Sequence, residues 1–284
     1  MNIIISGASG FLGQHLSKAF LRKNWNVSAI SRSDLELPDL LLSAKLASAD
    51  VIINLSGATI ARRWNSKYKE ILRSSRLITT HKLVSALALC PLQSRLFISV
   101  SASGIYSSSG VHDEENAVYS NNFLGNLCQE WEREAINASP FARIVIFRLG
   151  VALGKDGGAL QKMLPSFKLG VGGTIGNGLQ AFPWIHIDDV VNAFVFAIEN
   201  PPLSGAFNLT SPQRINNHNF TKALAKTLKR PAFIPIPSWI LKIIYGEGAT
   251  ALTSGQSIIP KRLPENGFNF RYTDIEQALR DIFS

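Results

Sequence analysis

The chain has 284 residues, of which 46% are hydrophobic and 17% are charged. This composition excludes a disordered or coiled-coil chain, and the length allows one large or two small domains with a sizeable core. Two cysteines, Cys90 and Cys128, cannot form a disulfide framework or a four-cysteine zinc site. No apolar run approaches the roughly 20 residues that a membrane helix needs, so we expect a cytoplasmic protein without a membrane partner.

The net charge of +9 is concentrated in two parts of the chain. Residues 61–100 contain eight basic residues and one acidic residue, and residues 201–250 contain six basic residues and one acidic residue. Clustered positive charge favours a phosphate-bearing ligand or an acidic partner, and the alternative is the solvated face of a helix. The basic residues are not interleaved with aromatic residues, so we expect no nucleic-acid partner.

Short apolar runs alternate with helical stretches in the first half of the chain. The pattern predicts strands at residues 2–6, 26–31, 50–55, 95–101 and 142–149, and helices at 11–23, 38–49, 66–90 and 123–137. The strands are almost continuously apolar, which is typical of a parallel sheet covered on both faces. Strands that alternate with helices predict an α/β fold with a doubly wound parallel sheet.

The connection between the second and third predicted strands is short. A full passage of helix, strand and helix does not fit between Arg32 and Val51, so one crossover helix is expected to be missing or reduced. Residues 35–37 are then interpreted as a vestigial strand. The second half of the chain has glycine-rich loops around a helical run at 160–169, and further helices are predicted at 188–199, 218–228, 238–245 and 273–283.

The first predicted strand runs into a glycine motif, Ser6-Gly-Ala-Ser-Gly-Phe-Leu-Gly13. Gly7 allows a tight turn, Gly10 allows a pyrophosphate to approach the backbone, and Gly13 allows the following helix to pack closely on the sheet. The start of that helix offers free N–H groups and a positive dipole end to phosphates. The motif therefore predicts a dinucleotide site, and the alternative is a glycine-rich turn without a ligand.

The residues after the second strand bear on the choice of cofactor. A site specific for NAD places a carboxylate here to bind the ribose 2′-hydroxyl. This chain has Ser31-Arg32-Ser33, and a guanidinium flanked by hydroxyls suits a 2′-phosphate. We therefore predict NADP as the cofactor, while Asp34 and Glu36 are close enough to keep NAD as an alternative.

Matching segments extend through nearly the whole chain, at residues 3–13, 54–64, 99–106, 148–160, 170–189 and 234–270. On these segments the chain resembles the extended short-chain dehydrogenase/reductase superfamily, in its NAD-dependent epimerase/dehydratase branch. Within that branch it resembles an atypical subgroup of "epimerase family" proteins that carry a small C-terminal domain of unknown function. The resemblance implies a Rossmann domain over residues 1–165, completed by about 185–210, and a smaller C-terminal α+β substrate lobe over 166–184 and 211–284.

The glycine motif and the resemblance together predict the residues that bind the cofactor. These are Gly7, Ser9, Gly10, Phe11, Leu12, Gly13, Ser31, Arg32, Leu55, Ser56, Gly57, Ala58 and Arg148. Arg148 is also a candidate for an anionic substrate or for pairing with a buried acid.

The catalytic pair of the superfamily is missing. Its members use Tyr-x-x-x-Lys on a helix, where the lysine and the cofactor lower the pKa of the tyrosine. No tyrosine in this chain has a lysine four residues later, and the best alignment puts Phe123 and Leu127 at the two positions. The candidate proton donors are then Tyr106, Ser101, Ser103, His186 or water. For Ser101 and Ser103, the alternative is that these small residues merely let the cofactor pack.

Three further residues are candidates for substrate contact. Gln180 follows a glycine-rich loop where relatives bind substrate, and Arg63 follows the turn at residues 56–58. His186 lies in a segment that resembles the family's Val-His-Val-Asp-Asp, where Asp188 or Asp189 is expected to cap the next helix. The histidines show no metal-ligand spacing, so we predict no metal.

Two functions follow from this pattern. The first is an NADP(H)-dependent oxidoreductase or epimerase that acts on a small carbonyl or alcohol substrate, with a nucleotide sugar as the guess from fold analogy. The second is a catalytically inactive NADP(H)-binding sensor or scaffold, a reading that the missing pair favours. Some members of the subgroup carry names linked to cell or plastid division, and the sequence leaves the oligomeric state open.

Overall fold

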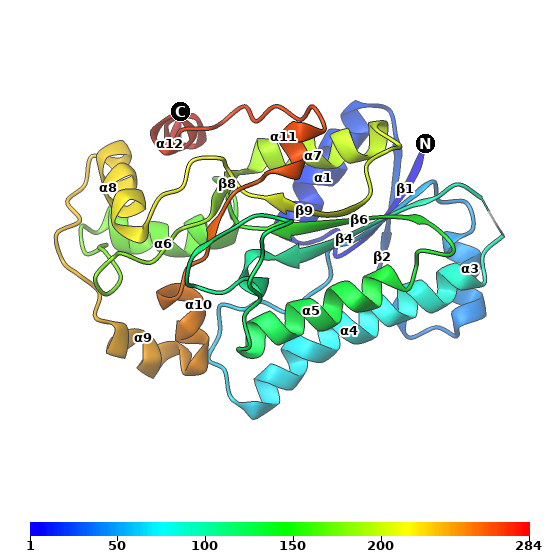
Figure 1. Ribbon diagram of the computed structural model, residues 1–284, viewed down its shortest axis with the longest axis horizontal. Helices are drawn as coiled ribbons and strands as arrows, with labels where there is room; N and C mark the ends of the chain where they lie inside the picture. The colour runs from blue at the N-terminus through cyan, green and yellow to red at the C-terminus, as the bar shows by residue number, and fades with distance from the viewer. Residues whose placement is uncertain (92) are drawn as a thin grey trace.

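The computed structural model describes residues 1–91 and 93–284, and it contains a central parallel sheet. The sheet has the strand order β2-β1-β3-β4-β6-β9 and all neighbours are parallel (Figure 1). The predicted fold class is confirmed. The strands of this sheet are β1 (Asn2–Ser6), β2 (Asn26–Ile30), β3 (Val51–Asn54), β4 (Leu96–Ala102), β6 (Arg143–Leu149) and β9 (Gly205–Leu209).

Helices cover both faces of the sheet. Because successive side chains of a strand point to opposite faces, Ile3 and Ile5 of β1 pack on one side and Ile4 on the other. Figure 1 shows α4 and α5 side by side along one face and α1 and α7 on the opposite face. These flanking helices are α1 (Phe11–Arg22), α3 (Asp39–Leu46), α4 (Ser66–Ala88), α5 (Phe123–Ile136) and α7 (Ile187–Glu199).

The connection from β2 to β3 is reduced, as the sequence predicts. It contains the short helix α2 (Arg32–Leu35) and then α3, with no strand between them. The prediction of a vestigial strand at residues 35–37 is therefore wrong. Ser31 and Asp34 form a capping box, in which each side chain binds the backbone N–H of the other, and this pair stabilises a helical turn directly after β2.

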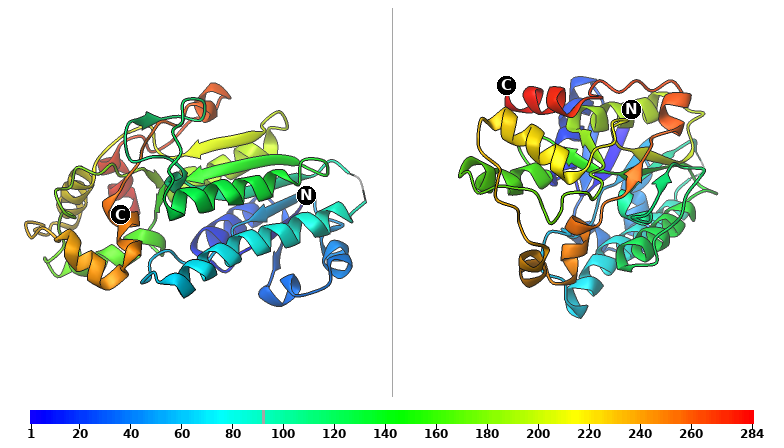
Figure 2. Two further views of the ribbon diagram at one scale, coloured as in Figure 1. Left: turned by 60° about the horizontal axis from the view of Figure 1, so that its bottom comes forward. Right: turned by 60° about the vertical axis from the view of Figure 1, so that its left-hand side comes forward.

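The rest of the chain forms a second, smaller group of elements beyond the carboxyl ends of the strands (Figure 2). Its core joins α6, α8 and α12 through apolar side chains such as Leu164, Phe220 and Leu279. The domain boundaries themselves stay a prediction. The elements are β7 (Val151–Leu153), α6 (Gly158–Lys168), β8 (Trp184–His186), α8 (Asn217–Leu228), α9 (Ser238–Tyr245), α10 (Thr250–Thr253) and α12 (Ile275–Phe283), with a 3-10 turn at Glu247–Ala249. The short helix α11 (Arg262–Glu265) instead packs on β9, and its Leu263 belongs to the core of the central sheet.

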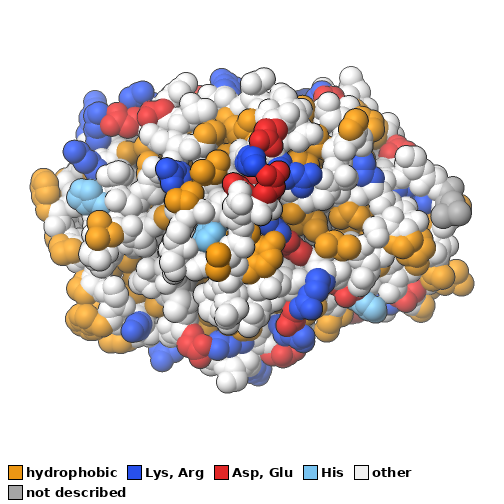
Figure 3. Space-filling view, viewed as in Figure 1, with side chains coloured by type: hydrophobic (Ala, Val, Ile, Leu, Met, Phe, Trp, Pro, Cys, Tyr) orange, Lys and Arg blue, Asp and Glu red, His pale blue; other side chains and the backbone are white. Residues whose placement is uncertain are grey.

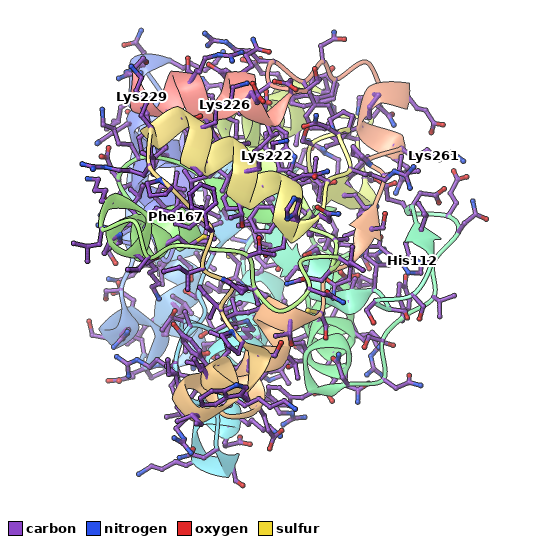
Figure 4. All side chains as sticks on the ribbon, turned by 90° about the vertical axis from the view of Figure 1, so that its left-hand side faces the viewer. His112, Phe167, Lys222, Lys226, Lys229 and Lys261 are labelled. Atoms are coloured by element: carbon purple, nitrogen blue, oxygen red, sulfur yellow. The ribbon has the colours of Figure 1, made fainter. Side chains whose placement is uncertain are left out.

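A short strand pair ties the C-terminal segment to the central sheet. The strand β5 (Val111–His112), which follows a 3-10 turn at Ser103–Ile105, pairs with β10 (Ser257–Ile258). Beside it, the Glu114 carboxylate accepts hydrogen bonds from the backbone N–H groups of Asn208 (2.8 Å) and Lys261 (3.1 Å). Figure 4 shows Lys261 close to His112 at this junction, with the lysines of α8 along another part of the same view.

The basic segment at residues 61–100 forms part of a mixed surface. Lys69 pairs with Glu247, Arg73 with Glu130 at 2.9 Å, and Lys82 with Asp39 at 2.6 Å. Figure 3 shows blue and red side chains side by side along the lower edge of the molecule. These pairs favour the solvated helix face over an acidic partner. Within the described ranges, no helix combines the length and the apolar character that crossing a bilayer requires.

Candidate functional site

The glycine motif forms a tight loop between β1 and α1. Gly7 has a positive φ of 81°, and a Cβ at Gly13 would lie 2.5 Å from the Gly7 carbonyl oxygen. Glycine is therefore required at both positions. Ser9 and Gly10 are exposed at the start of α1, and no side chain caps that helix. The first turn of α1 is thus open to a phosphate, as the sequence predicts.

Two of the predicted cofactor residues, Phe11 and Leu12, begin α1 and are half-buried. The Phe11 ring occupies the space beside Gly154 and Gly157, where a Cβ would approach ring atoms to 2.7 and 2.4 Å. Glycines after β7 therefore let the loop at residues 154–158 close over the first turn of α1. The Phe11 ring therefore packs between this loop and the glycine motif.

A buried polar network holds the turn that follows β3. The Asn54 side chain donates to Thr80 Oγ1 at 2.8 Å, and the Trp131 indole donates to the same oxygen at 2.8 Å. Ser56 contacts Ser6 through a hydrogen bond between their hydroxyls. The Ala58 backbone N–H donates to Ser75 Oγ at 3.0 Å. The turn therefore lies beside the glycine loop, at the edge of the sheet where doubly wound folds bind dinucleotides.

The end of β2 carries one free cation and one occupied carboxylate. Asp34 accepts hydrogen bonds from the Ser31 backbone N–H (2.8 Å) and hydroxyl (2.7 Å), and it pairs with Lys45. The hydrogen bond from Lys45 holds the pKa of Asp34 well below its usual range. Arg32 is exposed and forms no ion pair with any residue that the structure describes. Arg32 is therefore the free charge nearest to the end of β2, while Glu36, directly after α2, is exposed and also forms no ion pair within the described residues.

The structure revises the register of the missing catalytic pair. Leu124 of α5 lies beside Gly104, 3.7 Å from where a Cβ would be, and Cys128 packs with Ile105 and Tyr106 at the end of β4. Leu127 instead packs with Trp64 and Leu72, and the Phe123 ring meets the Trp64 ring at 5.7 Å. The positions that face the end of β4 are thus Leu124 and Cys128, one residue later than the sequence alignment places them.

Neither of these side chains moves a proton at neutral pH. Leucine has no titratable group, and burial raises the pKa of the Cys128 thiol to about 11. The conclusion that the Tyr-x-x-x-Lys pair is absent therefore holds in the revised register as well.

Tyr106 and Arg148 belong to a buried cluster behind this site. The Tyr106 hydroxyl donates to Asn208 at 2.7 Å and accepts from Arg148 Nη1 at 2.7 Å, and burial raises its pKa to about 12. Arg148 forms a two-pronged ion pair with Glu132, with Nε–Oε1 at 3.0 Å and Nη2–Oε2 at 2.8 Å. The guanidinium of Arg148 thus pairs with a buried acid, which is one of the alternatives that the sequence offers for it, and this pairing argues against the predicted contact with the cofactor. These contacts also argue against Tyr106 as a proton donor.

Ser101 and Ser103 differ in their surroundings. The Ser101 hydroxyl is buried next to Cys128 and has no protein hydrogen-bond partner of normal geometry within residues 1–91 and 93–284. Ser103 begins the 3-10 turn after β4 and is half-buried. Both hydroxyls lie at the carboxyl end of the central strand β4, so Ser101 and Ser103 remain predicted proton donors.

His186 has a structural role in this fold. Its Nδ1 accepts the Asp188 backbone N–H at 3.1 Å, so the imidazole caps α7, and its ring packs against the Tyr272 ring with 3.8 Å between the ring centres. The prediction that Asp188 or Asp189 caps this helix is wrong. Asp189 is buried and accepts the backbone N–H groups of Arg271 (2.8 Å) and Tyr272 (2.9 Å). The contacts of His186 therefore argue against its predicted contact with substrate.

The side chains of His186, Asp188 and Asp281 lie close enough to resemble a metal site. However, Nδ1 of His186 accepts a backbone hydrogen bond, so the proton of the neutral ring is on Nε2, which lies 3.4 Å from Asp281. A nitrogen that carries a proton cannot ligate a metal. The arrangement is explained by a neutral histidine beside a carboxylate.

Arg63 and Gln180 lie in different places. Arg63 is exposed and donates to the Ile243 carbonyl at 2.7 Å, so it connects the loop before α4 to α9. Gln180 lines a polar cavity of about 550 Å³, together with Ser108 and Arg214. Gln180 therefore remains the stronger of the two candidates for contact with a substrate.

Polar side chains of α4 that were not predicted from the sequence hold the turn at residues 55–58. Ser75, Arg76 and Thr80 all reach this turn or the network behind it. Arg76 and Thr80 are four residues apart and so share one face of the helix. This polar pair lies on a helix face that is expected to pack against the sheet, and it is the signal in the sequence that indicates these residues.

The parallel sheet, the glycine loop at a helix start and the turn after β3 define a dinucleotide-binding α/β protein. Residues 3–210 match the model of the NAD dependent epimerase/dehydratase family, and residues 236–282 match a domain of unknown function, DUF1731. The chain belongs to the NAD dependent epimerase/dehydratase family, as the sequence resemblance predicts.

Similar proteins occur in plants, animals and bacteria. The chain is 34% identical to the chloroplastic epimerase family protein SDR39U1 homolog of Arabidopsis thaliana, over 99% of this chain and 86% of the relative. It is 33% identical to epimerase family protein YfhF of Bacillus subtilis, over 100% and 98% of the two chains. A crystal structure of human epimerase family protein SDR39U1 (isoform 2) with NADPH superposes with a TM-score of 0.90 at 32% identity, over 99% of both chains.

A more distant likeness concerns the fold alone. The UDP-glucuronic acid 4-epimerase of Bacillus cereus, solved with UDP-glucuronic acid and NAD, has a TM-score of 0.78 at 19% identity, over 100% of this chain and 98% of that one.

Proposed function

We propose that this protein binds NADP(H) and acts as an oxidoreductase on a carbonyl or alcohol carbon of a small molecule. The observation that carries the proposal is the end of β2, where Arg32 is free and Asp34 is occupied by Ser31 and Lys45. A guanidinium there suits a 2′-phosphate, and the carboxylate nearest to it, Asp34, is not free to bind a 2′-hydroxyl. The NADPH in the human SDR39U1 structure supports the same choice.

The open first turn of α1 would hold the pyrophosphate, and the turn at residues 55–58 would border the other half of the cofactor. When bound, the cofactor supplies or accepts the hydride. The protein's own contribution is to orient the reacting carbon and to supply a proton from Ser101, Ser103 or water. The polar lining of the cavity at Gln180 and Arg214 favours a substrate rich in hydroxyl or phosphate groups, such as a nucleotide sugar.

The second candidate function is an NADP(H)-binding sensor or scaffold without catalysis. It is supported by Leu124 and Cys128 at the positions of the catalytic pair and by the buried hydrogen bonds of Tyr106. Both functions require the same cofactor site, so they differ only in whether a bound cofactor is oxidised or reduced.

Calorimetric titration with NADPH and NADH tests the cofactor site. Replacing Arg32 with glutamine should weaken NADPH binding about 10–100-fold, the loss of a charge-assisted contact, and leave NADH binding unchanged. Arg22→Gln, at the far end of α1, is the matched control and should bind both cofactors like the unmodified protein. Equal binding of NADPH and NADH, with no effect of Arg32→Gln, would contradict the choice of NADP(H).

Following the absorbance of NADPH during incubation with a panel of carbonyl compounds and nucleotide sugars separates the two functions. Oxidation that depends on one compound supports the oxidoreductase. Tight NADPH binding without oxidation by any compound supports the sensor. Turnover that is lost in Ser103→Ala or Ser101→Ala would identify the proton donor.

A further inference from the structure

Arg76 of α4 is half-buried, and within residues 1–91 and 93–284 it forms no ion pair. Its Nη1 donates to the Leu72 carbonyl at 3.1 Å and its Nη2 to the Ala58 carbonyl at 3.2 Å, and its guanidinium lies 5.2 Å from the centre of the Trp131 ring. Among the residues that the structure describes, no carboxylate pairs with it. Burial lowers the pKa of Arg76, so the fold disfavours this charge on its own. A partly accessible cation in such a place favours an anionic or hydroxyl-rich ligand.

The guanidinium lies directly against the turn that follows β3. A Cβ at Gly57 would be 3.0 Å from Arg76 Cζ, so the absence of a side chain at Gly57 lets the two groups meet. Gly57 itself is exposed at the carboxyl edge of the sheet. Arg76 therefore places its charge immediately behind the surface that borders the crevice at the strand ends.

Two other arginines next to the central sheet, Arg95 and Arg143, also donate to backbone carbonyls, but they do so at the opposite edge of the sheet. Arg95 precedes β4 and binds the carbonyls of Pro91 and Ala47, and Arg143 begins β6 and binds that of Ala197 at 3.0 Å. Those carbonyls lie at or near helix ends, where a cation is favourable without any ligand. Arg76 lies at the other edge, so this explanation does not apply to it.

The position of Arg76 relative to Arg32 indicates which half of a dinucleotide it would meet. In the strand order β2-β1-β3-β4, Arg32 lies at the end of β2, on one side of the glycine loop, and Arg76 lies behind the turn after β3, on the other side. A dinucleotide spans this crevice with its pyrophosphate at the start of α1. With the 2′-phosphate at Arg32, the nicotinamide half extends toward β3, β4 and Arg76.

We propose that Arg76 is a positioning residue for the nicotinamide–ribose half of NADP(H), and that it takes the place of the lysine that the superfamily carries on α5. The lysine position in the revised register is Cys128, whose buried thiol is neutral, and the Arg76 guanidinium lies against the same helix, 5.2 Å from the centre of the Trp131 ring. The positive charge is thus delivered to the same region from the neighbouring helix. This inference rests on the NADP(H) binding proposed above.

Binding measurements with three ligands test the inference without any turnover. They use NADPH, NADP⁺ and adenosine 2′,5′-bisphosphate, which contains only the adenosine half. Arg76→Gln should weaken NADPH binding about tenfold and leave the bisphosphate within about twofold, because Arg76 contacts the nicotinamide half alone. NADP⁺ carries a positive nicotinamide that Arg76 repels, so the preference for NADPH over NADP⁺ should fall about fivefold.

Matched variants separate this role from a structural one. Arg73→Gln, on the exposed side of the same helix, should leave all three affinities unchanged. Arg76→Lys keeps the charge and should retain most of the preference for NADPH. If Arg76→Gln fails to fold, Gly57→Ala takes its place, because this variant keeps the Arg76 side chain but displaces its guanidinium. It should also reduce the preference for NADPH over NADP⁺.

Two results would overturn the inference. One is that Arg76→Gln, or Gly57→Ala in its place, weakens all three ligands equally, which indicates that Arg76 only supports the turn. The other is that the variant changes none of the three affinities. If the unmodified protein binds neither NADPH nor the bisphosphate, the proposed function itself has failed, and this outcome is distinct from both.

Discussion

Replacing Glu132 with glutamine tests whether one buried ion pair holds the region behind the crevice together. Glu132 is 7% exposed and accepts three hydrogen bonds from Arg148, which in turn binds the hydroxyls of Tyr106 and Tyr119. Glutamine keeps the shape of the side chain but removes its charge. The Arg148 guanidinium is then a buried cation without a counter-ion, which typically costs about 3–5 kcal/mol of unfolding free energy.

Thermal unfolding measures this loss. An unfolding entropy of about 2.1 cal/mol/K per residue gives roughly 0.6 kcal/mol/K for a chain of this length, so the midpoint should fall by roughly 5–8 °C. The matched control is Glu130→Gln on the same helix, whose partner Arg73 is exposed, and it should cost less than about 1 kcal/mol. Replacing both members of the buried pair, as Glu132→Leu with Arg148→Met, should cost less than Glu132→Gln alone. A double variant less stable than the single one would refute the reasoning.

Three further predictions concern the glycine loop and the C-terminal segment. Gly13→Ala places a Cβ 2.5 Å from the Gly7 carbonyl oxygen, so NADPH binding measured by calorimetry should be lost, whereas Lys18→Ala on the exposed face of α1 should bind normally. Burial lowers the pKa of His186, so only the unfolded chain takes up this proton as the pH falls below about 6.5. Stability from this group is therefore intact above that pH and is lost toward pH 5, by at most about 1.4 kcal/mol per pH unit, and thermal melts of His186→Asn should show a flatter slope. Asp189→Asn removes the charge that binds two backbone N–H groups, so trypsin should cleave after Arg271 faster than in the unmodified protein.

The elements of the Rossmann part could be predicted because their signals are local. The apolar run at β1 and the glycine motif after it are contiguous in the sequence, and each residue type has one physical reason to be there. The same applies to Arg32, whose position after β2 follows from counting along the chain. The short connection between β2 and β3 could also be predicted, because it follows from the number of residues between the two strands. The strand expected within it was wrong, because the capping box of Ser31 and Asp34 stabilises a helical turn there.

The sequence was less informative where a side chain's partner is far away in the chain. Arg148 and Glu132 are 16 residues apart, and Tyr106 and Asn208 are 102 apart, so only the fold reveals that these groups satisfy one another. The same pair corrects the alignment of α5, because Glu132 must face β6 and this fixes which residues face β4. Tyr106 lies in a motif that resembles the family's, so the sequence alone makes it a candidate proton donor. Only the fold shows that its hydroxyl is hydrogen-bonded to Asn208 and Arg148.

The residues around the predicted reaction site lead to a last prediction about pH. Leu124 does not titrate, and burial raises the pKa of Cys128 to about 11 and that of Tyr106 to about 12. The nearby cation is an arginine, which stays protonated at any pH used in an assay. An enzyme with the Tyr-Lys pair shows the ionisation of its tyrosine in the pH dependence of turnover.

Once a substrate is found, the rate of NADPH oxidation at saturating substrate should therefore be nearly constant between about pH 6 and pH 9. A serine hydroxyl or water is neutral throughout that range, so the fraction of the donor that carries its proton does not change with pH. Arg76, the proposed positioning residue, also keeps its charge. The control is Cys128→Ser, which removes the thiol and should leave the profile flat. A rate that changes tenfold or more across this range, and that becomes constant in Cys128→Ser, would show that the thiol titrates during the reaction and that its burial in this fold does not keep it neutral.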